Sequence, residues 1–170
     1  MLQGLAPLLS TKTRLLVLGS FPGVASLQKQ QYYGHARNHF WKISAELLSP
    51  EPTLVMDMAY DKRCHWLLAH GVGLWDVYAA CEREGSLDSH IRHAQPNDFS
   101  QVQAACPELQ AVAHNGGESF KHAKHTQALG VPVYRLPSSS PANAGHTFEH
   151  KLHAWREVFM QAGLQVMGPQ

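Results

Sequence analysis

Two apolar segments, each followed by a polar turn, constrain the fold of this chain most. Leu15-Leu16-Val17-Leu18 is an uninterrupted apolar run, typical of a strand buried on both faces, and the turn Gly19-Ser20-Phe21-Pro22-Gly23 follows it. The short segment 131–136 precedes a second turn, Ser138-Ser139-Ser140-Pro141-Ala142-Asn143. Open α/β sheets bind ligands beyond the carboxyl ends of their strands, so we expect the two turns to face one cleft.

The rest of the chain alternates expected strands and helices. Apolar runs bounded by turn residues predict four strands, at 14–18, 73–78, 109–114 and 131–136. Amphipathic spacing predicts helices at 38–48, 63–70, 98–105 (with Asn97 as its N-cap), 117–129 and 147–161. The polar stretch 79–97 is expected to be an ordered loop. This alternation predicts an α/β fold, a three-layer α/β/α domain around a central, mainly parallel four-stranded sheet.

Composition narrows the class of protein. The 170 residues are 44% hydrophobic, which suits one globular domain with a sizeable core. The formal net charge is +1 with neutral histidines, so no global positive field indicates a protein that coats nucleic acid. An enzyme that meets only a few phosphates remains compatible with this charge, and 12 histidines would add positive charge below neutral pH.

The cysteines and the N-terminal residues indicate a compartment. Cys64, Cys81 and Cys106 are odd in number and lack a C-x-x-C pair, which predicts reduced thiols in a cytoplasmic protein. The start of the chain has no cationic region, and Pro7 interrupts its short apolar run, so we expect neither a signal peptide nor a membrane span. We expect a monomer without an obligate protein partner.

Three segments together resemble the uracil-DNA glycosylase superfamily. They are G-S-F-P-G at 19–23, Q-Q-Y-Y-G-H-A-R-N-H-F-W at 30–41 and S-S-S-P-A-N-A at 138–144. The resemblance extends from about 14 to 159, and is nearest to the hypoxanthine (deoxyinosine) DNA glycosylase branch, related to the mismatch-specific uracil glycosylases. It implies a single glycosylase domain over 1–170 that needs no cofactor. Its expected partner is DNA containing deaminated bases, from which it would release hypoxanthine and/or uracil, associating with the nucleoid through this substrate.

The same resemblance indicates Asn38 as the catalytic residue. Mismatch-specific relatives carry an asparagine in the first turn where this chain has Phe21, which cannot orient water. The carbonyl oxygen of Asn38 can orient a water molecule while its NH2 donates to the substrate. The alternative is that Asn38 is the N-cap of the helix that follows, and the two roles are compatible.

Four residues are expected to bind the base: Asn115, Tyr33, Phe21 and Ser20. Asn115 can both donate to and accept from a base edge, although an asparagine before two glycines is also typical of a turn. Tyr33 offers a planar face on which a flipped base can stack, and Tyr32 and Phe21 compete for this role or belong to the core.

DNA contacts are expected from Arg37 and from the second turn. The hydroxyls of Ser138, Ser139 and Ser140 can donate to phosphates, and Ala142 and Asn143 occupy the place of the relatives' DNA-penetrating wedge. Ala142 is smaller than the leucine usual there. The alternative is that the second turn only caps the last helix.

No metal site is predicted, because the histidines at helical spacing (His146, His150 and His153) have no cysteine or carboxylate that completes a ligand set. Asp76 is expected to support the pocket. No lysine suited to covalent attack stands out, which predicts a monofunctional enzyme. The alternatives are a uracil-preferring mismatch glycosylase, a non-catalytic damaged-DNA binding module and a nucleotide-binding domain, whose glycine-rich phosphate motifs are absent.

Overall fold

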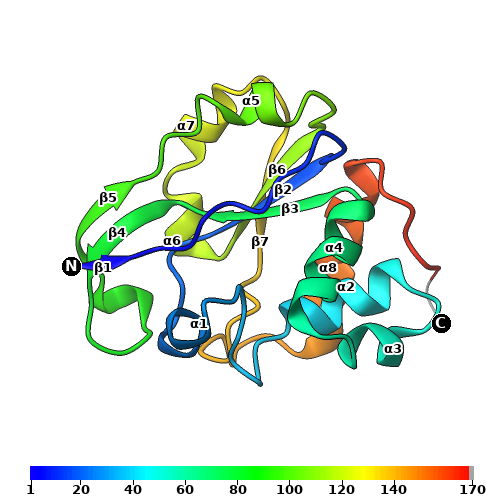
Figure 1. The fold of residues 1–170 in the computed structure, drawn as a ribbon, viewed down its shortest axis with the longest axis horizontal. Coiled ribbons are helices and arrows are strands. Elements are labelled where there is room, and N and C mark those ends of the chain that lie inside the picture. The colour runs from blue at the N-terminus through cyan, green and yellow to red at the C-terminus, as the bar shows by residue number, and fades with distance from the viewer. Residues whose placement is uncertain (169–170) are drawn as a thin grey trace.

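A four-stranded parallel sheet organises residues 1–168, the part of the chain that the computed structural model describes (Figure 1). Its strands are β2 (Leu15–Gly19), β3 (Val72–Asp76), β6 (Ala111–Asn115) and β7 (Val133–Leu136), in the order β3-β2-β6-β7. The register pairs Gly19 with Asp76 and Asn115 with Leu136, so the carboxyl ends of the strands lie along one edge. The predicted central sheet is confirmed.

Helices cover both faces of this sheet (Figure 1). In β2, Leu15 and Val17 pack into one apolar cluster and Leu16 and Leu18 into another, because successive strand side chains point to opposite faces. The expected three layers are therefore confirmed. One face carries α2 (Phe40–Leu48), α3 (Pro52–Met56), α4 (Tyr60–Ala69) and α8 (Phe148–Gln161), the other α5 (Val102–Ala105), α6 (Gly117–Phe120) and α7 (Ala123–Gln127), while α1 (Val24–Lys29) follows the first turn.

The prediction of an ordered loop at 79–97 is wrong. There, β4 (Tyr78–Glu82) pairs with β1 (Leu2–Gln3) on one side and with β5 (Arg92–Pro96) on the other, in an antiparallel sheet of order β1-β4-β5. The short 3-10 helix η1 (Asp88–His90) lies between β4 and β5. The sequence of β5 is Arg-His-Ala-Gln-Pro and most of it is exposed, so it has no apolar alternation from which a strand could be predicted.

The prediction of one helix at 117–129 is wrong, because this segment forms two short helices, α6 and α7. Both helices contact the same residue of the sheet, His114 of β6. Nδ1 and Nε2 of the buried His114 each lie 2.8 Å from a hydroxyl, those of Ser119 and Thr126 respectively. In one straight helix these residues would be about 10 Å apart along the axis, too far to meet one imidazole ring. The Ser119 hydroxyl donates to the Leu18 carbonyl, so it accepts from Nδ1–H. The Thr126 hydroxyl lies between two acceptors, Nε2 of the neutral ring at 2.8 Å and the Ala123 carbonyl oxygen at 3.1 Å. Burial lowers the pKa of His114 to about 4, consistent with this neutral ring.

Another predicted helix is shorter than expected. α5 begins at Val102 rather than at 98, and Asn97 does not cap it, because its amide donates to the Asp76 carbonyl at 2.8 Å. By contrast, Thr147 caps α8 as the predicted boundary implied, accepting from the His150 N–H at 3.1 Å. Within residues 1–168, no helix is both long enough and apolar enough to cross a membrane.

Candidate active site

A cavity of about 720 Å³ opens at the carboxyl edge of the parallel sheet. Its volume is typical of a site for a small organic group. Both turns line it, so the prediction that they face one cleft is confirmed. Arg37 is exposed and does not line the cavity. All other residues predicted for the site do: Ser20, Phe21, Tyr33, Asn38, Asn115, Ser138, Ser139, Ser140, Ala142 and Asn143.

Asn38 lies in the cavity wall just before α2. Its Oδ1 accepts a hydrogen bond from the Phe40 N–H at 2.9 Å, so the side chain binds the first N–H of α2 from one position before the N-cap residue, His39. Its Nδ2 makes no hydrogen bond within residues 1–168, and Oδ1 keeps a second lone pair. The side chain therefore binds the start of α2 without being its N-cap, and leaves free the groups that the proposed catalytic role requires.

Asn115 connects the end of β6 to the loop after β7. Its Oδ1 accepts from the Ser139 backbone N–H at 3.0 Å, and its Nδ2 donates to the Ser139 hydroxyl at 2.9 Å and to the Tyr33 hydroxyl at 3.3 Å. Both amide protons are thus used, and one lone pair of Oδ1 remains for a ligand. Base reading by Asn115 stays a prediction, but its structural role is evident.

The ring of Tyr33 stacks on Phe40, with centroids 4.3 Å apart and an angle of 23° between the planes. One aromatic face is therefore covered. Tyr33 also has a positive φ of 54°, and its hydroxyl accepts a hydrogen bond from Asn115 Nδ2 at 3.3 Å. Burial and the nearby Asp76 carboxylate raise the pKa of Tyr33, which keeps the hydroxyl neutral.

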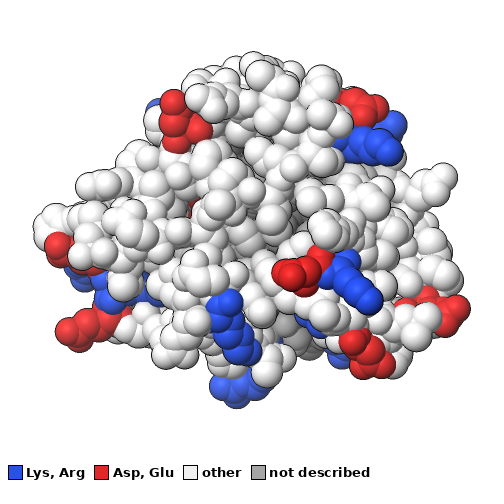
Figure 2. Space-filling view, viewed as in Figure 1, with Lys and Arg blue, Asp and Glu red and all other residues white. Residues whose placement is uncertain are grey.

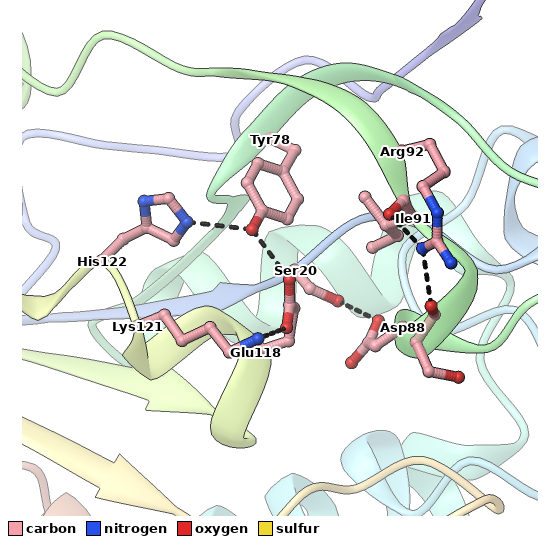
Figure 3. Close-up of polar contacts among 9 residues, drawn as sticks. Ser20, Tyr78, Asp88, Ile91, Arg92, Glu118, Lys121 and His122 are labelled. Atoms are coloured by element: carbon pink, nitrogen blue, oxygen red, sulfur yellow. Dashed lines mark hydrogen bonds and ion pairs between the residues drawn. The ribbon is translucent and has the colours of Figure 1, made fainter.

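Ser20 and Phe21 are nearly buried where the first turn meets the antiparallel sheet. The Ser20 hydroxyl donates to Asp88 Oδ1 at 2.6 Å (Figure 3), so its proton is already used. The Phe21 ring packs in the second apolar cluster beneath the guanidinium of Arg83, 5.3 Å from the ring centroid. Their predicted contacts with a base remain predictions.

A polar network beside this turn joins β4 to α6 (Figure 3). The Tyr78 hydroxyl donates to Glu118 Oε1 at 2.9 Å and accepts from His122 Nε2 at the same distance. Lys121 pairs with the other oxygen of Glu118 at 2.6 Å. Arg92 donates to the carbonyls of the η1 loop at 2.8 and 2.9 Å, and so holds this cavity wall in place.

The second turn, Ser138–Asn143 (the serine turn), is stabilised by hydrogen bonds between its own residues. The hydroxyl oxygens of Ser138 and Ser140 accept from the backbone N–H groups of Ser140 and Ala142, both at 3.1 Å, so their protons remain free to donate. Asn143 donates to the Ser138 carbonyl at 3.0 Å. Ser139 has no exposed surface and its hydroxyl and backbone N–H are paired with Asn115, so its predicted contact with DNA remains a prediction.

Lys151 of α8 is a residue that the sequence pattern did not indicate. It is 1% exposed, and its Nζ lies 3.2 Å from His39 Nδ1 and 3.5 Å from the Ser140 carbonyl oxygen. Burial lowers the pKa of Lys151, and burial and Lys151 lower that of His39. Lys151 thus connects α8 to the serine turn through its hydrogen bond to the Ser140 carbonyl oxygen.

The cavity rim carries both apolar and basic side chains. Leu87 is 47% exposed and Val24 is 40% exposed, and both line the cavity. The rings of His146 and His150 stack with centroids 4.5 Å apart at this rim. Within residues 1–168, no three histidine, cysteine or acidic side chains are grouped so that they could hold a metal ion.

A three-layer α/β/α fold with a cavity at the carboxyl ends of its central strands defines a class of ligand-binding and catalytic domains. The sequence model described as the Uracil DNA glycosylase superfamily matches residues 6–159, and the chain therefore belongs to this superfamily.

The chain is similar to two hypoxanthine DNA glycosylases and to one solved structure. A hypoxanthine DNA glycosylase from Methanosarcina acetivorans is 36% identical over 157 residues, which cover 92% of this chain and 97% of the relative. A hypoxanthine DNA glycosylase from Methanosarcina barkeri is 34% identical with the same coverage. The solution NMR structure of a candidate uracil DNA glycosylase from Methanosarcina acetivorans superimposes with a TM-score of 0.82 at 34% identity, covering 95% of this chain and 98% of that one.

Proposed function

We propose that this protein is a monofunctional DNA N-glycosylase that hydrolyses the N-glycosidic bond of a flipped deaminated base, hypoxanthine and/or uracil, and leaves an abasic site. The observation that carries the proposal is the cavity between the two turns, with the unpartnered amide NH2 of Asn38 in its wall. The names of the relatives that match nearly the whole chain support it.

Asn38 is proposed to act on the water molecule and the substrate. A base within a duplex is out of reach, so the nucleotide must first leave the stack, at a cost of roughly a few kcal/mol. As the bond to the base breaks, its electron pair leaves with the base and positive charge develops on the sugar. Water then attacks the anomeric carbon, and the proton that water loses is taken up by the departing base. The free lone pair of Asn38 Oδ1 would orient this water, while Nδ2 donates to the substrate.

The position of Lys151 supports hydrolysis without strand cleavage. Among residues 1–168, no lysine lines the cavity, and the Nζ of Lys151 is directed to His39 and Ser140 instead. The product should therefore be an intact abasic strand that breaks only after alkali or heat. Trapping of a covalent enzyme–DNA adduct with borohydride would contradict this.

DNA is proposed to lie across the rim of the cavity. The free hydroxyl protons of Ser138 and Ser140 and the exposed Arg37 would bind phosphates. Figure 2 shows lysines and arginines interspersed with acidic residues on the face drawn, which favours a few local phosphate contacts over a broad basic surface. The exposed Leu87 provides an apolar group that could insert beside the flipped base, a role for which Ala142 is small. We further propose that the protein acts as a cytoplasmic monomer.

Two variants of Asn38 separate catalysis from capping. Asn38→Ala removes both functions, whereas Asn38→Ser keeps an oxygen that can cap Phe40 but has no amide. We expect both to lose most single-turnover base release, and only the alanine variant to lose about 1 kcal/mol of stability. A serine variant with wild-type rates would remove Asn38 from the mechanism.

The substrate panel should contain hypoxanthine and uracil in single and double strands, with alkali to reveal abasic sites. Faster release of uracil would favour the uracil-preferring alternative. Binding of damaged DNA without release of any base would favour the non-catalytic module.

A further inference from the structure

One arginine stands out among the side chains of the cavity wall. Within residues 1–168, Arg135 of β7 is the only lysine or arginine that lines the cavity. Its side chain is exposed and makes neither a hydrogen bond nor an ion pair within the same residues. Glu118, the acidic residue of α6, is already bonded to Lys121 and to Tyr78. The guanidinium of Arg135 is therefore available to a ligand.

An aromatic ring and the sheet hold this guanidinium in position. Its Cζ lies 5.7 Å from the centroid of the Phe120 ring, within the range of a cation–π contact. The Phe120 ring packs edge-on against His114, with centroids 5.8 Å apart and 82° between the planes. His114 is also the β6 residue that pairs with Arg135 in the parallel sheet. The arginine thus belongs to a regular element of the fold, which positions a binding group better than a loop does.

Two glycines leave room beside the guanidinium. A Cβ at position 117 would be 3.1 Å from Nη2 of Arg135, and Gly117 does not have a positive φ, so its backbone conformation alone does not require glycine. At Gly116, a Cβ would be 3.2 Å from the Cβ of Ser138. Arg135 and Ser138 therefore border the same pair of glycines. The hydroxyl of Ser138 accepts from the Ser140 N–H, which leaves its proton free to donate on this side of the cavity.

The cavity also contains two carboxyl groups, which oppose the approach of an anion. Asp76, on the cavity floor at the end of β3, and Asp88 both line it. Oδ2 of Asp76 is buried and accepts no hydrogen bond within residues 1–168. Burial and then the Asp88 carboxylate raise the pKa of Asp76 to about 7, while Arg83 lowers it. A DNA strand brings further negative charge to the mouth of this cavity, and Arg135 is the side chain placed to offset it.

We propose that Arg135 binds the phosphodiester next to the flipped nucleotide, and that the Ser138 hydroxyl donates to the same phosphate. The proposal rests on the proposed function and names a contact through which its site holds the substrate strand. A phosphodiester has two oxygens outside the chain linkage, and the fork of a guanidinium can donate to both. The exposure of Arg135 favours a phosphate at the rim over a base inside the cavity.

Binding of a DNA duplex with a tetrahydrofuran residue at the lesion position tests the contact, because this probe has no base to recognise or release. At pH 8, where histidine is ordinarily neutral, Arg135→Gln should weaken binding on the order of tenfold. The slope of log affinity against log salt concentration should become shallower by about 0.9, the value for one phosphate. Arg135→Lys should keep the slope but recover only part of the affinity, since lysine lacks the planar fork.

Arg14→Gln is the matched control for the lost charge. Arg14 is exposed just before β2, at the opposite edge of the sheet, where it bonds the Gly163 carbonyl. This variant loses the same unit of charge as Arg135→Gln and should bind the probe as wild type does. An equal loss of affinity in the two variants would reduce the effect of Arg135 to net charge and overturn the proposal.

Neutral phosphates then identify the contact. A methylphosphonate replaces in turn each of the two linkages that flank the tetrahydrofuran. At one of them, wild type should lose affinity on the order of tenfold, while Arg135→Gln should lose little more. Losses that add at both linkages, or unchanged binding by Arg135→Gln, would overturn the proposal. A loss by Arg135→Gln that appears only when the probe carries a base would also overturn it, since the arginine would then contact the base.

Release of hypoxanthine from a duplex, measured alongside, separates this proposal from the proposed function. Base release by wild type together with additive losses in the binding assay would refute the phosphate contact and leave the proposed function intact. Coupling between Arg135 and one linkage, without release of any base, would support the contact while the proposed function fails.

Discussion

Asn115→Ala should destabilise the protein by a large amount, because one amide holds three segments together. The side chain lies at the end of β6 and bonds the loop after β7 through Ser139 and the segment before α2 through Tyr33. Alanine removes all of these contacts. It also leaves the backbone N–H of Ser139, a residue with no exposed surface, without a partner.

The magnitude follows from those contacts. Two hydrogen bonds of 2.9 and 3.0 Å contribute about 1 kcal/mol each, and the 3.3 Å bond to Tyr33 less. The unsatisfied N–H adds about 1–3 kcal/mol. We therefore expect the free energy of unfolding to fall by about 3–6 kcal/mol.

Urea denaturation of wild type, Asn115→Ala and Asn115→Asp tests this reasoning. The aspartate can still accept from the Ser139 N–H and from the two neighbouring hydroxyls, so it should keep most of the stability. An alanine variant with the wild-type midpoint would refute the network as a source of stability. Base reading is tested separately, since the aspartate variant should then shift lesion preference by about 1–3 kcal/mol, and an unchanged preference would count against that role.

Three further predictions concern the rim, the sheet and the cavity floor. Leu87→Ser should slow base release from duplex DNA on the order of tenfold, because an inserted apolar group fills the place of the flipped base. Release from single-stranded DNA, which needs no such group, should be unaffected. Equal slowing on both substrates would contradict this. The pKa of His114 is about 4 against 6.5 when unfolded, so only the unfolded chain binds a proton between these values. Stability should therefore fall by about 3 kcal/mol as pH drops from 6.5 to 4, and His114→Gln should lack this part of the dependence in urea titrations. The pKa of Asp76 is raised from 3.8 to about 7, so between these values the unfolded chain has lost the proton that the folded protein keeps, and stability falls as pH rises. Asp76→Asn should be more stable than wild type at pH 8, by up to about 4 kcal/mol, and not at pH 4, as thermal denaturation at the two pH values would show.

The parallel sheet could be predicted because its strands carry strong local signals. β2 is apolar at every position before Gly19, and a strand covered on both faces requires this. β5 could not be predicted, since its polar residues form a strand only through pairing with β4. The sequence pattern predicted one helix where α6 and α7 form two. The interruption between them depends on contacts with His114, which lies on β6 and not in the segment itself.

The site was predictable to the level of motifs but not of contacts. Resemblance placed Asn38 and Asn115, and both line the cavity. No local pattern shows that Asn115 is bonded to a serine 24 residues away or that Lys151 of α8 is buried against His39. The lack of a partner for Asp76 is likewise visible only once the surrounding elements are in place.

The cavity wall is assembled from segments that run from Gly19 to His150, nearly the whole length of the chain. Each parallel strand joins the sheet only after a long crossover, so contacts of high sequence separation must form before any of these groups meet. Lys151 adds the last connection, from a helix that begins more than a hundred residues after Asn38. A nascent or partly folded chain therefore contains no rudimentary version of the site, and the capacity to bind a base arises in the same cooperative step as the native state.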